Sequence, residues 1–246
     1  MPGGGMAEMV SVFMIVMTRL SPIVFFLPGI GEEPIPVRVR LMALLGLSVS
    51  ITSMGIVEPV PTSPFANYLF VLLGEALVGL CLGISLRIVS WVLGAAGAII
   101  AQMIGLAQFV GEALQTEAQT ITANFLSMAG AALLVTADFH LTVLRSLFNL
   151  YADLPPGQVP LLEPSFFVQN IVSAFSLAVT LAWPLVAMGL IYNVCLGFIN
   201  RAMPQLMVAF VGAPFMVGAG LVLLTLSFAS IMFVWMDHVP RLIGWL

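Results

Sequence analysis

The sequence predicts an all-α, polytopic membrane protein built from about six long, partly broken apolar helical segments. Of its 246 residues, 61% are hydrophobic and only 7% are charged, whereas a soluble domain usually carries about 25% charged residues. The apolar residues gather in runs that proline-rich stretches separate, and such runs are typical of membrane-spanning helices. The runs cover residues 9–28, 37–57, 65–108, 120–151, 165–196 and 205–236.

The connections between several of these runs are rich in proline. Residues 29–36, 57–64 and 152–164 contain two, three and four prolines, respectively. Proline ends helices because it lacks the backbone N–H donor and clashes with the preceding turn. No basic residue precedes the first run, so residues 9–28 are interpreted as a retained span and not as a cleaved signal.

The lengths of the runs carry information about the fold. A straight span needs about 20 apolar residues, and the first two runs fit that length. The other four contain 32 to 44 residues, so they must tilt, extend beyond the bilayer or break. Residues suited to a break are Gly94, Gly97, Pro184 and Pro214. Long, inclined helices suit a chain that wraps around an axis.

Small residues recur at helix-packing spacing. Gly79 and Gly83 are four residues apart, and so are Gly97, Ala101 and Gly105. Such rows allow helix backbones to approach closely inside a membrane. They predict either a seam between subunits or ordinary packing within the chain.

The composition excludes several kinds of chemistry. All seven basic residues are arginines, so the chain has neither a P-loop lysine nor a Schiff-base amine. Cys81 and Cys195 lie in apolar runs and are interpreted as small buried hydrophobes, and no metal-ligand spacing is present. No protease motif and no basic surface for nucleic acid occurs. We therefore expect no enzyme, no cofactor and no metal site.

Polar residues inside apolar runs need partners because unpaired charges are costly in lipid. Glu75 is expected to face a pore, a partner subunit or Arg87. Asp138 and Arg145 are seven residues apart, so a continuous helix would place them on one face. With His140, they are interpreted as an interhelical polar network. A further polar stripe, read as a subunit contact or a structured turn, consists of Asn193, Asn200, Arg201 and Gln205.

The stretch AQMIGLAQFVGEALQTEAQ, residues 101–119, interrupts the apolar pattern. It contains four glutamines, two glutamates, two glycines and one phenylalanine, and it has no basic residue. Irregular polar backbone at membrane depth is tolerated only where it is buried in protein or lines a water-filled space. The stretch therefore needs a special environment or an exposed position.

Several motifs occur together in a family-specific order. They are Arg19 before a Pro/Gly turn, PVRVRL at 36–41, GEALVGLCLG at 74–83, GLAQF at 105–109, His140 ahead of a proline-rich connection, and NRAMPQLMVAFVGAP at 200–214. In this order the chain resembles, over nearly its whole length, the FliR family of export-gate proteins, which flagella share with virulence type III secretion systems.

The resemblance implies a role in assembly. A family member joins FliP-like and FliQ-like membrane subunits as a single copy in a helical hetero-oligomer and meets an FlhB-like subunit. The assembly lies in the bacterial inner membrane, at the centre of the flagellar basal body, and passes unfolded export substrates. Residues 1–165 would be a P-like portion and residues 166–246 a Q-like terminal hairpin.

The resemblance also gives the polar stretch a role. In the family, the loop after the third segment enters the channel and helps to close it, which corresponds to residues 103–115 here. Bulky side chains would block the lumen, glycines would let the loop bend, and glutamine would be tolerated in a wet channel. The plug residues are Met103, Ile104, Gly105, Leu106, Gln108, Phe109 and Gly111.

Two other functions remain open from the residues alone. Glu75, Asp138 and His140 could form the midplane site of a secondary transporter of a small solute, although no internal repeat is found. A membrane scaffold without a channel is the third alternative.

Overall fold

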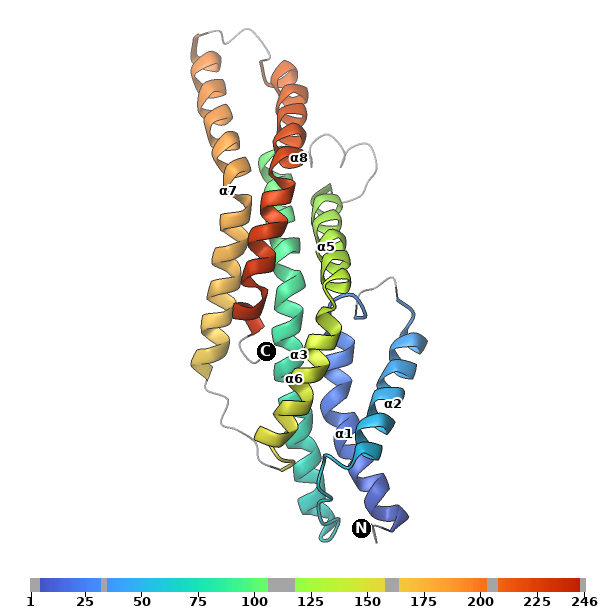
Figure 1. The fold of residues 1–246 in the computed structure, drawn as a ribbon. Helices are drawn as coiled ribbons and strands as arrows, with labels where there is room; N and C mark the ends of the chain where they lie inside the picture. The colour runs from blue at the N-terminus through green and yellow to red at the C-terminus, as the bar shows by residue number, and fades with distance from the viewer. Residues whose placement is uncertain (1–4, 32–34, 106–117, 158–163, 203–207, 244–246) are drawn as a thin grey trace. The chain divides into compact units, whose positions relative to one another are not determined.

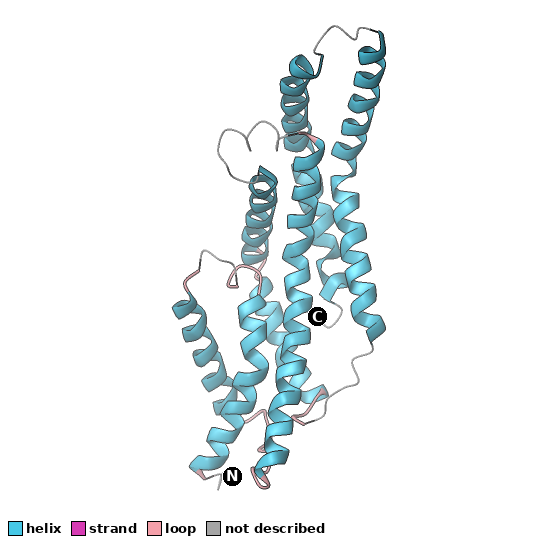
Figure 2. Cartoon of the chain, turned by 180° about the vertical axis from the view of Figure 1, so that it is seen from behind, coloured by secondary structure: helices cyan, strands magenta, loops and turns pink. Residues whose placement is uncertain are grey.

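The computed structural model describes residues 5–31, 35–105, 118–157, 164–202 and 208–243, and every regular element in these ranges is a helix (Figures 1 and 2). The helices are α1 Met6–Phe26, α2 Val37–Met54, α3 Phe65–Met103, α5 Ala118–Thr136, α6 Phe139–Asp153, α7 Pro164–Ala202 and α8 Val208–Ile243. The predicted all-α membrane fold is confirmed.

Five of these helices are long and apolar enough to cross a membrane, and a sixth span results if α5 and α6 count as one. Their boundaries follow the turn residues. Helix α2 begins after Pro36 and ends at Gly55, whose φ of 65° is left-handed and whose N–H donates to the carbonyl of Thr52. Glycine adopts this conformation without a steric penalty, so it ends helices well.

The long helices do not break at the residues that the sequence offered for a break. Helix α3 continues through Gly94 and Gly97, α7 through Pro184 and α8 through Pro214. Neighbouring helices in a membrane protein can support the backbone around an internal proline. At a rise of about 1.5 Å per residue, the 39 residues of α3 extend about 58 Å, well beyond a hydrocarbon core of about 30 Å. Tilting or extension beyond the bilayer is therefore required.

The fourth run is the one that bends. Its two parts, Ile121–Thr136 and Phe139–Tyr151, meet at an angle of 66°. Asp138 lies at the bend with a φ of 53°, and its carbonyl accepts the N–H groups of Leu141 and Thr142. Aspartate tolerates this left-handed conformation better than most side chains. The expected continuous helix carrying Asp138 and Arg145 on one face is therefore wrong.

The chain forms two compact units. The first contains residues 1–89, 131–170 and 243–246, and the second contains residues 90–130 and 171–242. The P-like portion expected from the sequence ends at residue 165, and the Q-like hairpin begins at residue 166. That boundary rests on likeness to other proteins, so the compact units do not test it and it stays a prediction.

Each unit has an apolar core of its own. In the first unit, α1 packs against α2. Each of α1, α2, α3 and α6 contributes a fully buried side chain, and these are Ile15, Leu44, Leu86 and Leu147, respectively. In the second unit, Trp235 of α8 is completely buried and lies beside Gly130 of α5. Apolar burial of this kind stabilises each unit once its helices have formed.

Three glycines of the small-residue rows pack within the chain, whereas Gly105 has no atom of the described residues within 4 Å of an added Cβ. A Cβ atom on Gly79 would meet the backbone carbonyl of Arg19, and one on Gly83 would meet that of Pro22. A Cβ atom on Gly97 would stand 2.6 Å from the Cα of Ala123 in α5. Of the two alternatives for these rows, internal packing holds at all three glycines.

Close packing at Gly79 yields a first prediction. Gly79→Val should destabilise the protein by about 1–3 kcal/mol or more, because its side chain would collide with backbone that cannot move aside. The measurement is thermal unfolding of the detergent-solubilised protein. Gly46 is exposed in α2 and has no atom within 4 Å of an added Cβ, so Gly46→Val is the matched control. Equal losses in the two variants would contradict the packing.

Candidate functional site

A buried ion pair lies at the centre of the first unit. The Nε of Arg19 in α1 donates to Oε2 of Glu75 in α3 at 2.5 Å, and Nη2 donates to Oε1 at 3.0 Å. The side chains are 0% and 2% exposed. Two parallel N–H···O bonds are the strong geometry for arginine and a carboxylate because both planar groups are satisfied at once.

Further groups complete the surroundings of this pair. Both terminal nitrogens of Arg19 donate to the carbonyl of Leu154 at 3.2 Å, and Oε1 of Glu75 accepts the N–H of Gly157 at 3.3 Å. The guanidinium carbon of Arg19 stands 4.4 Å from the ring centroid of Tyr151, a cation–π geometry. We call these five residues the Arg19–Glu75 cluster. It ties α1 and α3 to the chain that follows α6.

Glu75 pairs with Arg19 and not with Arg87, which was one of the three alternatives expected for it. Arg87 lies about three turns further along the same unbroken helix, and its side chain is exposed. A signal for Arg19 was present. Arg19 lies in an apolar run without an acidic neighbour, and Gly79, one turn after Glu75, marks the face of α3 that a neighbouring helix approaches.

The expected network of Asp138, His140 and Arg145 does not form. Asp138 and Arg145 are exposed and His140 is half-buried. Throughout the described ranges, no hydrogen bond or ion pair joins these side chains to one another or to Glu75. All three residues lie at the start of α6 or within it, and none of them is buried between helices, where a polar side chain would need a partner.

The polar stripe near the end of α7 is exposed. Asn193, Asn200 and Arg201 lie on the surface of the second unit, and Nδ2 of Asn193 donates to the carbonyl of Gly189 at 2.8 Å. Gln205 lies outside the described residues. The exposure leaves the subunit contact as a prediction. Cys195 in the same region is exposed and not buried as expected, whereas Cys81 is half-buried.

The structure describes the beginning of the predicted plug. Met103 ends α3, Ile104 is completely buried, and Gly105 has a φ of 68°. Ile104 is therefore held in the packing of the second unit. Leu106, Gln108, Phe109 and Gly111 lie outside the described residues, so the plug as a whole stays a prediction.

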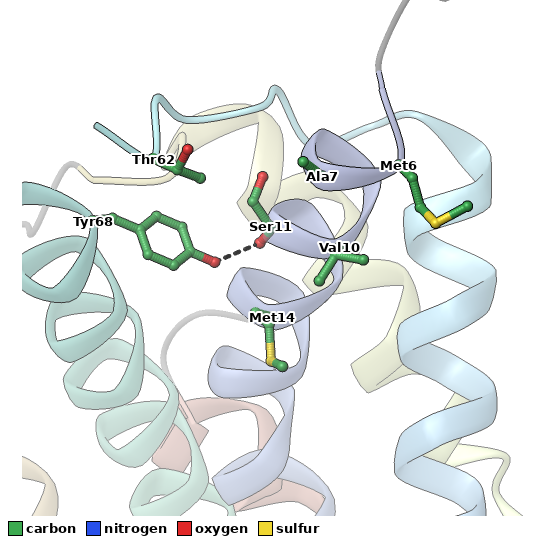
Figure 3. Close-up of a pocket in the computed structure, with 7 residues that line it drawn as sticks. All are labelled: Met6, Ala7, Val10, Ser11, Met14, Thr62 and Tyr68. Carbon is green, nitrogen blue, oxygen red and sulfur yellow. Dashed lines mark hydrogen bonds between the residues drawn. The ribbon is translucent and has the colours of Figure 1, made fainter. Parts of the chain in front are cut away.

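An open groove of about 480 Å³ lies between the N-terminal turns of α1 and α3 (Figure 3). Two of its three side-chain hydroxyls are engaged, because the hydroxyl of Tyr68 donates to the carbonyl of Ser11 at 3.0 Å, and the hydroxyl of Ser11 donates to the carbonyl of Glu8. Met6, Val10 and Met14 give it an apolar lining. Such a lining offers little to orient a polar solute.

Residues of the kind that hold metals do not gather in the part of the chain that the structure describes. No group of three or more His, Cys, Asp or Glu side chains is placed there for a metal ion. In the Arg19–Glu75 cluster the carboxylate of Glu75 is bound on both oxygens, and the buried hydroxyl of Tyr151 has no hydrogen-bond partner among the described residues. The geometry of the cluster serves to hold helices together.

Comparison with known proteins identifies the family. The family described as bacterial export proteins, family 1, matches residues 10–242. The chain belongs to this family. The match includes the Arg19–Glu75 cluster and all seven helices of the described ranges except the first turn of α1 and the last residue of α8.

Individual export proteins of this family are similar over most of their length. The flagellar biosynthetic protein FliR of Caulobacter vibrioides is 32% identical over 243 residues, which cover 96% of each chain. FliR of Aquifex aeolicus is 29% identical over 89% of this chain and 86% of its own. The surface presentation of antigens protein SpaR of Shigella flexneri is 27% identical over 81% of this chain and 79% of its own. This export-family chain is thus a polytopic membrane protein.

The buried cluster yields a second prediction. Glu75→Ala should destabilise the protein by about 3–5 kcal/mol, because it leaves the guanidinium of Arg19 buried without its charge partner. Denaturant unfolding in detergent measures the loss. The exposed pair of Arg241 and Asp237, whose side chains are 70% and 60% exposed, provides the control, since Arg241→Ala should cost less than about 1 kcal/mol.

A double variant sharpens this test. Replacing Arg19 and Glu75 together by leucine should destabilise less than Glu75→Ala alone, because no buried charge remains. A Glu75→Ala variant as stable as Arg241→Ala would show that the ion pair does not hold the first unit together.

Proposed function

We propose that this chain is a core subunit of a type III protein export gate in the bacterial inner membrane, and that the system is flagellar. The family match over residues 10–242 carries the proposal. The flagellar FliR relative from Caulobacter vibrioides matches along nearly the whole of both chains, which favours a flagellar basal body over an injectisome.

In this proposal the chain acts in a complex. It enters as a single copy among FliP-like and FliQ-like subunits, meets an FlhB-like subunit, and helps to conduct unfolded substrates. Apolar side chains that are exposed in the isolated chain support this, because they need lipid or a partner to cover them. Met42 of α2 is 72% exposed, and Leu226 and Phe233 of α8 are 74% and 77% exposed.

The chain contributes a plug but no catalysis. The loop of residues 103–115 enters the channel, and bulk from Leu106 and Phe109 closes it. The structure supports a fixed base for this loop, because Ile104 is buried at the end of α3. Gly105 follows with a left-handed φ and has no atom within 4 Å of an added Cβ, which gives the chain a place to turn.

The secondary-transporter alternative gains no support from the described residues. Glu75 is bound by Arg19 and by the N–H of Gly157. Asp138 is exposed at the bend between α5 and α6. A midplane site needs ionisable groups that converge on a solute, and these two carboxylates do not.

The composition of the complex is the third prediction. The chain is co-expressed with its neighbouring membrane genes, extracted in mild detergent and weighed by native mass spectrometry. We expect one copy of this chain with several copies of two smaller membrane proteins. If the chain is recovered as a monomer or homodimer without those proteins, its proposed role in an export gate is excluded.

Loss of the plug is the fourth prediction. Deleting residues 105–111 should raise ion leakage through the assembled complex, because the bulk that fills the lumen is removed. Conductance in lipid bilayers measures the leakage. Replacing residues 106–111 by an equal number of glycine and serine residues separates the effect of side-chain bulk from that of loop length. Unchanged leakage in both variants would remove the plug from the proposal.

A further inference from the structure

The end of α3 packs against α8 at Gly220. Ile104 is completely buried, and its N–H donates to the carbonyl of Ile100 at 3.0 Å, so it still belongs to the helical hydrogen-bond ladder. Its Cγ2 methyl occupies the place where a side chain on Gly220 would begin. Gly220 is buried as well. Ile104 thus fills the space that is open because Gly220 has no side chain.

A second glycine holds the same turn from α7. A Cβ atom on Gly189 would stand 3.2 Å from the carbonyl oxygen of Met103 and 3.5 Å from its Cβ. The terminal methyl of Met216 in α8 would lie 3.5 Å from the same point. Both helices of the α7–α8 hairpin therefore contact the end of α3 through glycines. We call Met103, Ile104, Gly189 and Gly220 the α3 socket.

Other glycines of the same two helices have no such role. Gly197 in α7 and Gly218 in α8 are exposed, and an added Cβ would have no atom within 4 Å at either position. A glycine in a helix is less favourable than an alanine. At Gly189 and Gly220 the close approach of α3 is the physical reason for accepting that cost.

The socket lies directly before a change in backbone direction. Gly105 has a φ of 68°, and its N–H donates to the carbonyl of Gln102 at 3.4 Å. Its surroundings are open where those of Ile104 are filled. One residue is fixed by packing and the next is free to turn, so the socket determines where the chain leaves α3.

We propose that Ile104 is a positioning residue, through which the α7–α8 hairpin sets the start of the segment that the proposed function assigns to the plug. This inference rests on that function. Tightly packed contacts change between discrete arrangements more readily than they stretch. A shift of α8 at Gly220 therefore moves Ile104, and with it the exit point at Gly105.

The test is an enlarged side chain at the socket with a matched control two residues away. In the assembled complex, Gly220→Ala should raise ion leakage per complex several-fold, because its methyl displaces Ile104. Gly218→Ala, in open space on the same helix, should leave leakage within twofold of the unchanged protein. Ile104→Ala should also raise leakage, because it removes the anchoring side chain.

A double variant distinguishes positioning from mere loss of stability. Ile104→Ala removes the methyl group that collides with Gly220→Ala, and the new methyl group fills part of the vacated space. The leakage of the combined variant should therefore be lower than that of either single variant. Leakage is normalised to assembled complex. A purely structural role would lower the amount of complex and leave leakage per complex unchanged.

Chemical labelling provides a readout that does not depend on a plug. In a background with Cys81→Ser and Cys195→Ser, the rate of maleimide labelling of Gln102→Cys, an exposed position in the last turn of α3, reports on the exit point. Gly220→Ala should change that rate at least threefold, and Gly218→Ala should not. An unchanged rate together with unchanged leakage would overturn the inference, even if deleting residues 105–111 raises leakage. A changed rate without leakage in the deletion would keep the positioning role and remove the plug.

Discussion

The first unit depends on one electrostatic constraint, namely that Arg19 and Glu75 are buried in apolar surroundings and must satisfy each other. A buried arginine without its carboxylate would cost several kcal/mol, so α1 and α3 can pack only in the register that aligns the two groups. Gly79 permits this register because α3 can approach the backbone of Arg19. Leu154 and Gly157 then extend the constraint to the chain after α6.

Steric fit plays the corresponding part in the second unit. Its contacts depend on missing side chains, with Gly97 against Ala123, Gly130 against Leu93 and Gly220 against Ile104. In lipid the hydrophobic effect does not favour one apolar helix face over another, because lipid tails are equally apolar. Close packing therefore decides which helices associate. The first unit thus combines a paired charge with close packing at Gly79, whereas the contacts of the second unit described above depend on close packing.

Much of the fold could be predicted from the sequence because membrane helices leave a strong local signal. The six apolar runs correspond to the helices, with proline and glycine near their ends. The bend at Asp138 could not be predicted, because it depends on one residue in a left-handed conformation. The pairing of Glu75 with Arg19 was missed since it joins residues distant in sequence. The plug is a prediction that comes from the likeness to a known family, because the residue patterns alone gave only a polar interruption.

The Arg19–Glu75 cluster also sets an order for biosynthesis. Arg19 precedes Glu75 by 56 residues and Leu154 by 135. At about 5–20 residues per second, the first separation corresponds to about 3–11 s of translation. During this interval α1 carries an arginine whose carboxylate partner has not been made, and a lone charge in an apolar helix is expensive in lipid. The nascent helix must therefore wait at a polar boundary or beside the insertion machinery until α3 arrives, which makes pairing of α1 with α3 an early step in assembly.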